Sequence, residues 1–347
     1  LPAEKILLPG LYDENSESGW IYIDGDVTQS FLVAETRKRH QSIVQRLVDL
    51  VRYYLKNESI YKGQVITGDM EFVYLGDFDA DALVLSEAAR HVVETQIMLP
   101  ILRPELADSL GVEPRRSALL FGQFGTGKSM LLREIARRAS DAGWTVFVNR
   151  EGDGMLDMLR LAKLYQPSVI QIEDVDERIG GGRSDDMNQL LNMMDGAFGK
   201  NDRIVTLYTT NNAERIHEAA LRPGRISVAL ELGALDGQGM KRLIGQCGFR
   251  LDSNIDWDAI ATAYQELMPC YVKEAANRIG MEKQDEKDGV TEDDVRLALE
   301  GMKSHYRLQQ SAVSGHEQDT LERRFREIMG AAFYEALDAI DCPKAGF

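Results

Sequence analysis

The sequence is poor in the residues that build disulfide-stabilised domains and metal centres. Its 347 residues include three cysteines, Cys247, Cys270 and Cys342, and five scattered histidines. Cysteines that are few, odd in number and unclustered indicate neither a disulfide framework nor a zinc site, and they are typical of a reducing compartment. We therefore expect neither a disulfide-rich secreted fold nor a structural zinc centre.

Long apolar runs and net positive charge are missing as well. No segment approaches the ~20 apolar residues that a membrane-spanning helix needs, and the start, LPAEKILLPG, lacks the pattern of a secretory signal. The net charge of −16 argues against non-specific nucleic-acid binding, which depends on Lys and Arg neutralising phosphates, although a local basic groove stays open. We expect a soluble, cytoplasmic protein with no membrane partner and without nucleic acid as its main ligand.

The first part of the chain predicts a small α+β module. A chain of this length has room for about two domains. Within residues 1–78, the segments 20–23 and 63–75 are rich in β-formers, and apolar residues recur every four positions between 43 and 55, as in an amphipathic helix. No residues there suggest chemistry, so a recruitment or assembly role is expected.

Residues 79–235 alternate short apolar runs with helical stretches, a pattern typical of a parallel α/β sheet. The runs lie at 117–121, 145–148, 168–172, 203–210 and 227–232. Residues 236–308 are mostly helical, and Thr291 to Asp294 resemble the capped start of a helix. Residues 309–347 form a polar linker and a C-terminal helix with one apolar stripe, which packs on its own or a neighbouring subunit or else binds a dedicated partner.

The run at 117–121 is followed directly by Gly-Gln-Phe-Gly-Thr-Gly-Lys-Ser and then by a helical pattern. This is the glycine-rich phosphate loop in the context it requires. Glycines let backbone N–H groups approach a polyphosphate, Lys128 reaches its β- and γ-phosphates, and the hydroxyl of Ser129 is a magnesium ligand. The residues expected to bind the nucleotide are Gly122, Gln123, Phe124, Gly125, Thr126, Gly127, Lys128, Ser129 and Met130. The pattern predicts a nucleoside triphosphate with Mg²⁺.

Another apolar run, SVIQI at 168–172, ends in Glu173 and Asp174, and Asp176 follows. Taken alone, these acids could be no more than the solvated end of a strand. Beside a phosphate loop they gain a role, because a second acid at the end of a neighbouring strand holds the hydrated magnesium. The apolar register makes Glu173 the metal-side acid and Asp174 the acid that activates the attacking water.

From about residue 84 to 305 the sequence resembles the AAA subgroup of the AAA+ ATPases. The resemblance is carried by the approach to the phosphate loop, by NQLLNMMDG (188–196) and most specifically by TTNNAERIHEAALRPGRI (209–226). It implies an α/β fold in which a parallel sheet flanked by helices is followed by a small helical lid. It also implies ATP as the nucleotide.

The resemblance assigns further residues. Asn211 would be the sensor that helps to place the attacking water, and Arg222 and Arg225 would be arginine fingers that reach a neighbouring subunit's nucleotide. A planar guanidinium suits the charge that develops during phosphoryl transfer. Arginines supplied in trans make hydrolysis depend on assembly, so a homo-oligomeric ring, usually a hexamer, is implied.

The order of the two acids departs from the family pattern. Glu173 precedes Asp174, whereas the family usually has Asp and then Glu. In the expected register, the metal-side acid is one methylene too long and the base one too short, each by ~1.5 Å. General-base geometry tolerates little displacement. We therefore expect slow but real hydrolysis.

Three other segments also depart from that pattern or lack an expected feature. The threading loop within 147–166 is short and acidic, and its candidate gripping residues, Met155 and Leu156, could equally be helix core, so peptide threading is in doubt. The glycine-rich loop 180–186 has one positive charge, Arg183. In the lid, Pro269 and Cys270 replace the usual Gly-Ala pair, which alters the expected contact with the nucleotide.

These observations leave three functions open. The leading one is an ATP-driven ring that remodels a protein or protein complex. The alternative is an ATP-gated oligomeric scaffold with slow or vestigial hydrolysis, suggested by the acid order and the short loop. A nucleic-acid remodeller is disfavoured by the charge. The end of the sequence, CPKAGF, lacks the hydrophobic-Tyr-any-residue signature with which some ring ATPases dock a proteasome, so the sequence gives no support for a proteasomal role.

Overall fold

The computed structural model describes residues 4–6, 19–25, 30–36, 41–76, 82–112, 116–150, 153–176, 202–215, 225–283 and 289–307. The chain divides into two compact units, Leu1–Gly239 and Met240–Phe347. The break lies close to the expected start of the lid at 236, although the predicted domain boundaries stay predictions. Arg222, the loop 180–186, the segment 188–196, Cys342 and the expected C-terminal helix lie outside the described residues.

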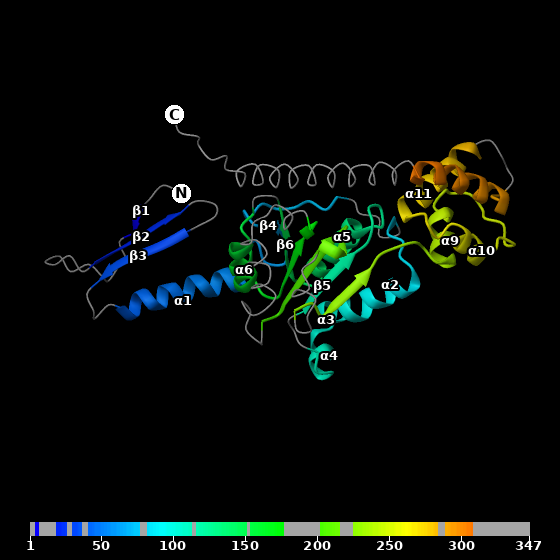
Figure 1. Ribbon diagram of the computed structural model, residues 1–347. Coiled ribbons are helices and arrows are strands. Elements are labelled where there is room, and N and C mark those ends of the chain that lie inside the picture. Colours follow the sequence, from blue (N-terminus) through cyan, green and yellow to red (C-terminus); the bar gives the residue numbers. More distant parts are fainter. Residues whose placement is uncertain are drawn as a thin grey trace, which may run out of the picture. The chain divides into compact units, whose positions relative to one another are not determined.

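A six-stranded sheet, in the order β4-β6-β7-β8-β5-β9, lies at the centre of the first unit (Figure 1). Every neighbouring pair in it is parallel. The strands are β4 (Val65–Thr67), β5 (Arg116–Phe121), β6 (Thr145–Asn149), β7 (Ser168–Ile172), β8 (Ile204–Thr210) and β9 (Val228–Glu231). The predicted α/β class and the five predicted strands from 117 to 232 are confirmed.

Both faces of the sheet are apolar and covered, as expected of parallel strands. Alternate strand residues point to opposite faces, so Val169 and Ile170 belong to two separate buried clusters. One cluster includes α5 (Lys128–Asp141), α2 (Glu87–Val92) and the π-helical turn η3 (Val93–Met98). The other includes α6 (Met155–Leu164). Two short helices, α3 (Leu99–Leu102) and α4 (Pro104–Ser109), follow η3.

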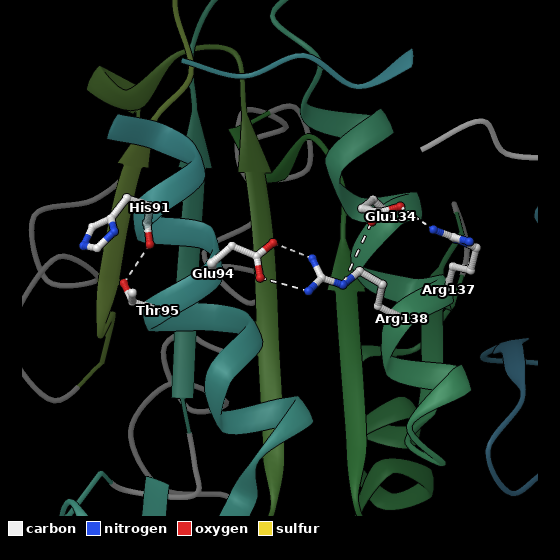
Figure 2. Close-up of polar contacts among 6 residues, drawn as sticks. All are labelled: His91, Glu94, Thr95, Glu134, Arg137 and Arg138. Carbon is white, nitrogen blue, oxygen red and sulfur yellow. Dashed lines mark hydrogen bonds and ion pairs between the residues drawn. The ribbon is translucent and has the colours of Figure 1, made fainter. Parts of the chain in front are cut away.

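An ion pair joins the π-helical turn to α5, the helix that follows the phosphate loop. Figure 2 shows the Glu94 carboxylate facing the Arg138 guanidinium, which donates two hydrogen bonds of 2.5 and 2.9 Å. Within the same segment, the Thr95 hydroxyl donates to the carbonyl of His91 at 2.7 Å. This two-bond pair, the Glu94–Arg138 fork, fixes the segment before β5 against α5, the helix that follows the phosphate loop.

The N-terminal part begins with an antiparallel sheet of β1 (Glu4–Ile6), β2 (Gly19–Gly25) and β3 (Ser30–Thr36). The helix α1 (Gln41–Asn57) follows. The strand expected at 20–23 and the helix expected at 43–55 are therefore confirmed.

The segment 63–75 differs from the expectation. Instead of one long strand of the N-terminal module, it holds the short β4, a turn at Met70 with φ of 64°, and a bridge from Ile66 to Phe72. β4 pairs with β6, because Val65–Thr67 lie opposite Val146–Val148. The central sheet thus begins upstream of residue 79, where the ATPase subdomain was expected to start.

The second unit is helical in its described part. After α9 (Gly237–Gly245), which spans the division, come α10 (Trp257–Ala263), α11 (Pro269–Glu282) and a helix over 292–307. The predicted cap is present, since the Thr291 hydroxyl accepts from Asp294 N at 3.3 Å and the Asp294 carboxylate accepts from Thr291 N at 2.8 Å. None of the helices in the described part of the chain combines the length and apolarity needed to span a bilayer.

Candidate active site

The phosphate loop leaves the sheet where only glycine fits. Gly122 has a φ of +150°, and a Cβ there would lie 2.0 Å from the carbonyl oxygen of Leu232. This close approach arises because the loop starts between two neighbouring strands: Leu232 N donates to Phe121 O at 2.7 Å, and Gly122 N donates to Thr210 O at 3.3 Å. At the other end, Gly127 has a φ of +96° directly before α5 begins at Lys128.

Lys128 is buried under its own loop. Its side chain donates to the carbonyl oxygens of Gly122 at 2.7 Å and Gln123 at 2.9 Å, and the residue is 7% exposed. Burial lowers the pKa of Lys128, and the negative charges of Asp174, Asp176 and Glu173 oppose that shift. The ammonium group is therefore held by the carbonyls of its own loop, and the charges of the three acids favour its protonated form.

The remaining loop residues surround this lysine. The Thr126 hydroxyl donates to Gln123 O at 2.9 Å, and the exposed ring of Phe124 has its centroid 6.0 Å from Lys128 Nζ. Gln123, Gly125 and Ser129 are exposed, whereas Met130 packs against the core cluster on the α5 face. The loop thus presents backbone and polar groups outward and anchors its helix inward.

The two acids after β7 face different partners. Glu173 Oε2 accepts a hydrogen bond of 2.5 Å from the Ser129 hydroxyl, whereas Asp174 Oδ1 accepts one of 2.9 Å from the Asn211 side-chain amide. The expected register is therefore observed, with Glu173 beside the predicted magnesium ligand and Asp174 beside the predicted sensor. The backbone of Asp174 is left-handed, with a φ of 48°, and its N–H donates to Thr209 Oγ1 at 3.0 Å.

All these groups lie at one edge of the sheet. The loop follows β5, the acids follow β7 and Asn211 follows β8, and β8 lies between β7 and β5 in the sheet. The carboxyl ends of parallel strands are where ligands bind in open α/β sheets. The sequence motifs are thus brought together although more than 80 residues separate the first from the last.

Comparison with known proteins gives the family. Residues 118–234 match the family model described as "ATPase family associated with various cellular activities (AAA)". This part of the chain is an AAA ATPase domain. The match runs from within β5 to just past β9 and includes every residue of the candidate site.

Relatives of the AAA domain include proteasome regulatory subunits and proteasome-activating nucleotidases. The chain is 32% identical over 197 residues to the 26S proteasome regulatory subunit 7 homolog of Schizosaccharomyces pombe, covering 50% of this chain and 43% of that protein. It is 30% identical over 233 residues to the proteasome-activating nucleotidase of Methanocaldococcus jannaschii, covering 61% of this chain and 53% of that protein. It is 29% identical over 222 residues to the 26S proteasome regulatory subunit 4 homolog of Encephalitozoon cuniculi, covering 58% and 52%. The chain thus spans about half the length of these relatives.

The AAA domain places Arg225 away from its own site. Arg225 lies in a turn before β9, at the amino ends of the strands, whereas the phosphate loop, acids and Asn211 lie at the carboxyl ends. Strands of this length put the two edges about 15–20 Å apart. Arg222, the other predicted arginine finger, lies outside the described residues.

The donor set fits magnesium bound to a nucleotide. Within the described ranges, no three His, Cys, Asp or Glu residues are grouped so that they could hold a metal ion. Ser129 and Glu173 nevertheless bring two oxygen atoms into contact. Magnesium is commonly bound through one or two protein oxygens, substrate phosphates and water, and not by a complete set of protein ligands. The Ser129–Glu173 pair therefore suits magnesium that is carried on a nucleotide.

The loop after β6 is tied to the β4 hairpin. The Asp153 carboxylate accepts from Arg150 N at 2.7 Å and from Gly68 N at 3.3 Å, and Arg150 pairs with Glu71 at 2.9 Å. Met155 and Leu156 form the first turn of α6 directly afterwards. This short, tethered loop leaves the peptide-gripping role of those two residues a prediction.

The lid pair Pro269 and Cys270 lies at the start of α11. Pro269 occupies the first turn of α11, where a missing N–H costs nothing because that donor has no partner within the helix. Cys270 and Cys247 are free thiols, and burial raises the pKa of Cys270. That this pair alters the lid's contact with the nucleotide stays a prediction.

Two site residues were not singled out from the sequence. Thr209 and Thr210, the last residues of β8, are both buried and both bond to the acidic segment after β7. Their signal was the pair of threonines at the end of an apolar strand directly before Asn211. Asp176, which accepts from Thr210, was visible in the sequence but carried no assigned role.

Proposed function

We propose that this protein hydrolyses ATP in a homo-oligomeric ring and uses that reaction to remodel a protein or a protein complex. The observation that carries the proposal is the cluster at the carboxyl edge of the sheet. There Ser129 contacts Glu173, Asn211 contacts Asp174, and the negative charges of Asp174, Asp176 and Glu173 act on Lys128.

The loop and its helix would hold the phosphates of ATP. Backbone N–H groups of a glycine-rich loop and the start of a helix favour negative charge. Lys128 supplies a positive charge for the β- and γ-phosphates, and Ser129 with Glu173 would hold Mg²⁺. When bound, the metal neutralises charge that develops on the phosphate oxygens.

Asp174 and Asn211 would handle the attacking water. Asp174 Oδ1 is an acceptor at the site edge, suited to take the proton that water loses. The Asn211 amide holds that carboxylate and can orient the water beside it. The shorter acid at this position supports a low rate of hydrolysis.

A ring would complete the site. Arg225 lies at the far edge of its own sheet, so it suits a site on a neighbouring copy better than the site of its own chain. We extend this to Arg222 and to a hexamer on the family resemblance. The proteasomal names of several relatives favour a protein over a nucleic acid as the substrate, as does the net charge of −16.

A nucleotide-gated scaffold is the second candidate. The order of Glu173 and Asp174 and the short loop after β6 favour it. In that case ATP binding would build the assembly, and hydrolysis would be vestigial and insensitive to any protein partner.

Steady-state hydrolysis of Mg-ATP separates the candidates. We expect measurable turnover in the wild type, loss of ATP binding in Lys128→Ala, and ATP binding with at least about 100-fold slower turnover in Asp174→Asn. Asp157→Asn, an exposed acid on α6, is the matched control and should behave like the wild type. Wild-type turnover no faster than that of Asp174→Asn would contradict the hydrolytic proposal and favour the scaffold.

A further inference from the structure

Asp176 is a buried acid that the proposed reaction does not use. It is 4% exposed, although it lies only two residues from Asp174. Its Oδ1 accepts a hydrogen bond of 2.7 Å from the Thr210 hydroxyl and a longer one of 3.4 Å from Asn211 N. A buried carboxylate is costly unless it is well paired, so its retention beside the site calls for a reason.

The Thr210 hydroxyl has no freedom to turn elsewhere. Its oxygen accepts from Asn212 N at 3.0 Å, so its single proton is left for Asp176. Thr210 itself is fully buried. The carboxylate and the hydroxyl therefore fix the backbone at residues 210–212 through three hydrogen bonds.

That backbone carries Asn211. The Asn211 side chain donates to Asp174 Oδ1 at 2.9 Å, while Thr209 Oγ1 accepts from the backbone N–H of Asp174 at 3.0 Å. The ends of β7 and β8 are thus cross-linked on both sides of the amide that would orient the water. A shift of the β8 end would move Asn211 away from Asp174.

We infer that Asp176 is a positioning residue for ATP hydrolysis, acting through Thr210 on Asn211. This inference rests on the proposed function. Asp176 touches neither the phosphate loop nor the Ser129–Glu173 pair by any hydrogen bond among the described residues, and its Oδ1 already accepts two. Its task is that of a hydrogen-bond acceptor, which an asparagine oxygen can also perform.

Kinetics of four variants test the inference. Asp176→Ala and Thr210→Val should each lower kcat about tenfold and leave the ATP dissociation constant within about twofold. Asp176→Asn and Thr210→Ser keep the hydrogen bond and should stay within about threefold of the wild-type kcat. The double variant Asp176→Ala/Thr210→Val should be slowed by less than the product of the two single effects, because both changes remove the Thr210–Asp176 bond and each removes only one further bond.

A second readout is independent of hydrolysis. Backbone amide hydrogen exchange of Asn211 and Asn212, measured without nucleotide, should be faster in Asp176→Ala and Thr210→Val and unchanged in Asp176→Asn. If the wild type fails to hydrolyse ATP, the proposed function fails, and this exchange still decides the positioning role. If Asp176→Ala does not fold, Thr210→Val carries the test.

Three results would overturn the inference. One is unchanged kcat and exchange in Thr210→Val. Another is loss of ATP binding together with kcat in Asp176→Ala, which would assign the acid to the nucleotide. The third is an Asp176→Asn variant as slow as Asp176→Ala, which would mean that the negative charge and not the acceptor matters.

Discussion

At the scale of single residues, the acid order has a backbone reason. Asp174 has a φ of 48°, in the left-handed region that Asp and Asn enter more readily than longer side chains. The longer Glu173, whose φ is not positive, accepts a hydrogen bond from Ser129. The sequence was enough to predict the motif residues, and to predict that Glu173 faces the magnesium ligand and Asp174 the sensor. In the sequence alone, however, the order Glu then Asp looked like a mismatch with the family pattern. The backbone angle at Asp174, which no motif encodes, favours a short acid there, even though that acid supports only slow hydrolysis.

Gly122 gives a residue-scale prediction with a matched control. In Gly122→Ala the new Cβ would meet the Leu232 carbonyl at 2.0 Å, whereas in Gly111→Ala, with a φ of +71°, no atom lies within 4 Å. We expect Gly111→Ala to cost only about 1–2 kcal/mol of unfolding free energy, from the left-handed backbone. Gly122→Ala should cost more than about 3 kcal/mol and weaken ATP binding.

Urea unfolding and ATP titration of both variants measure the difference. Equal losses in the two would mean that backbone conformation alone matters and that the close approach of β9 to the loop does not.

At the scale of elements, long apolar runs were predictable and short or irregular elements were not. The strands β5 to β8 are almost entirely buried on both faces, so their runs are largely apolar, whereas β9 alternates buried and exposed residues. β4 has three residues, and its pairing with β6 depends on contacts about 80 residues apart, which local pattern cannot reveal. The π-helical turn η3 has no sequence signature. The Thr210–Asp176 hydrogen bond joins the ends of two strands, so local pattern cannot predict it either.

The Glu94–Arg138 fork predicts a small pH-dependent contribution to stability. The hydrogen bonds from Arg138 hold the pKa of Glu94 below its ordinary value of 4.5. A carboxyl whose folded pKa is depressed stabilises the fold above its unfolded pKa, and this contribution is lost as pH falls through the folded pKa. The side chains of Arg138 and Glu94 are 25% and 45% exposed, so Glu94→Gln should lower the free energy of unfolding by less than about 1 kcal/mol at pH 7.

Urea unfolding from pH 7 down to about pH 3 checks this, with the exposed Glu58→Gln as control. The gap between Glu94→Gln and the wild type should close at the acidic end. A gap that widens on acidification would show that the folded pKa of Glu94 is not depressed.

At the scale of the whole molecule, the residues of the proposed site are distributed between two edges of one sheet. The phosphate loop, the acids and Asn211 follow their strands, whereas Arg225 precedes β9. A single copy cannot bring these groups together without rebuilding the sheet. Neighbouring copies in a ring can bring them together, because the amino-end edge of one sheet can then face the carboxyl-end edge of the next. This is why we place the arginine's partner in a second copy.

Subunit mixing tests this account most directly. Arg225→Ala keeps its own acids, and Asp174→Asn keeps its arginine, so each variant alone should be inactive in steady-state Mg-ATP hydrolysis. A 1:1 mixture should recover about a quarter of wild-type activity, because about one interface in four then joins an intact Asp174 to an intact Arg225. A mixture of Arg225→Ala with the double variant Asp174→Asn/Arg225→Ala should stay inactive. Recovery in the first mixture alone is the predicted result, and a first mixture as inactive as its components would contradict a site completed by a neighbouring copy.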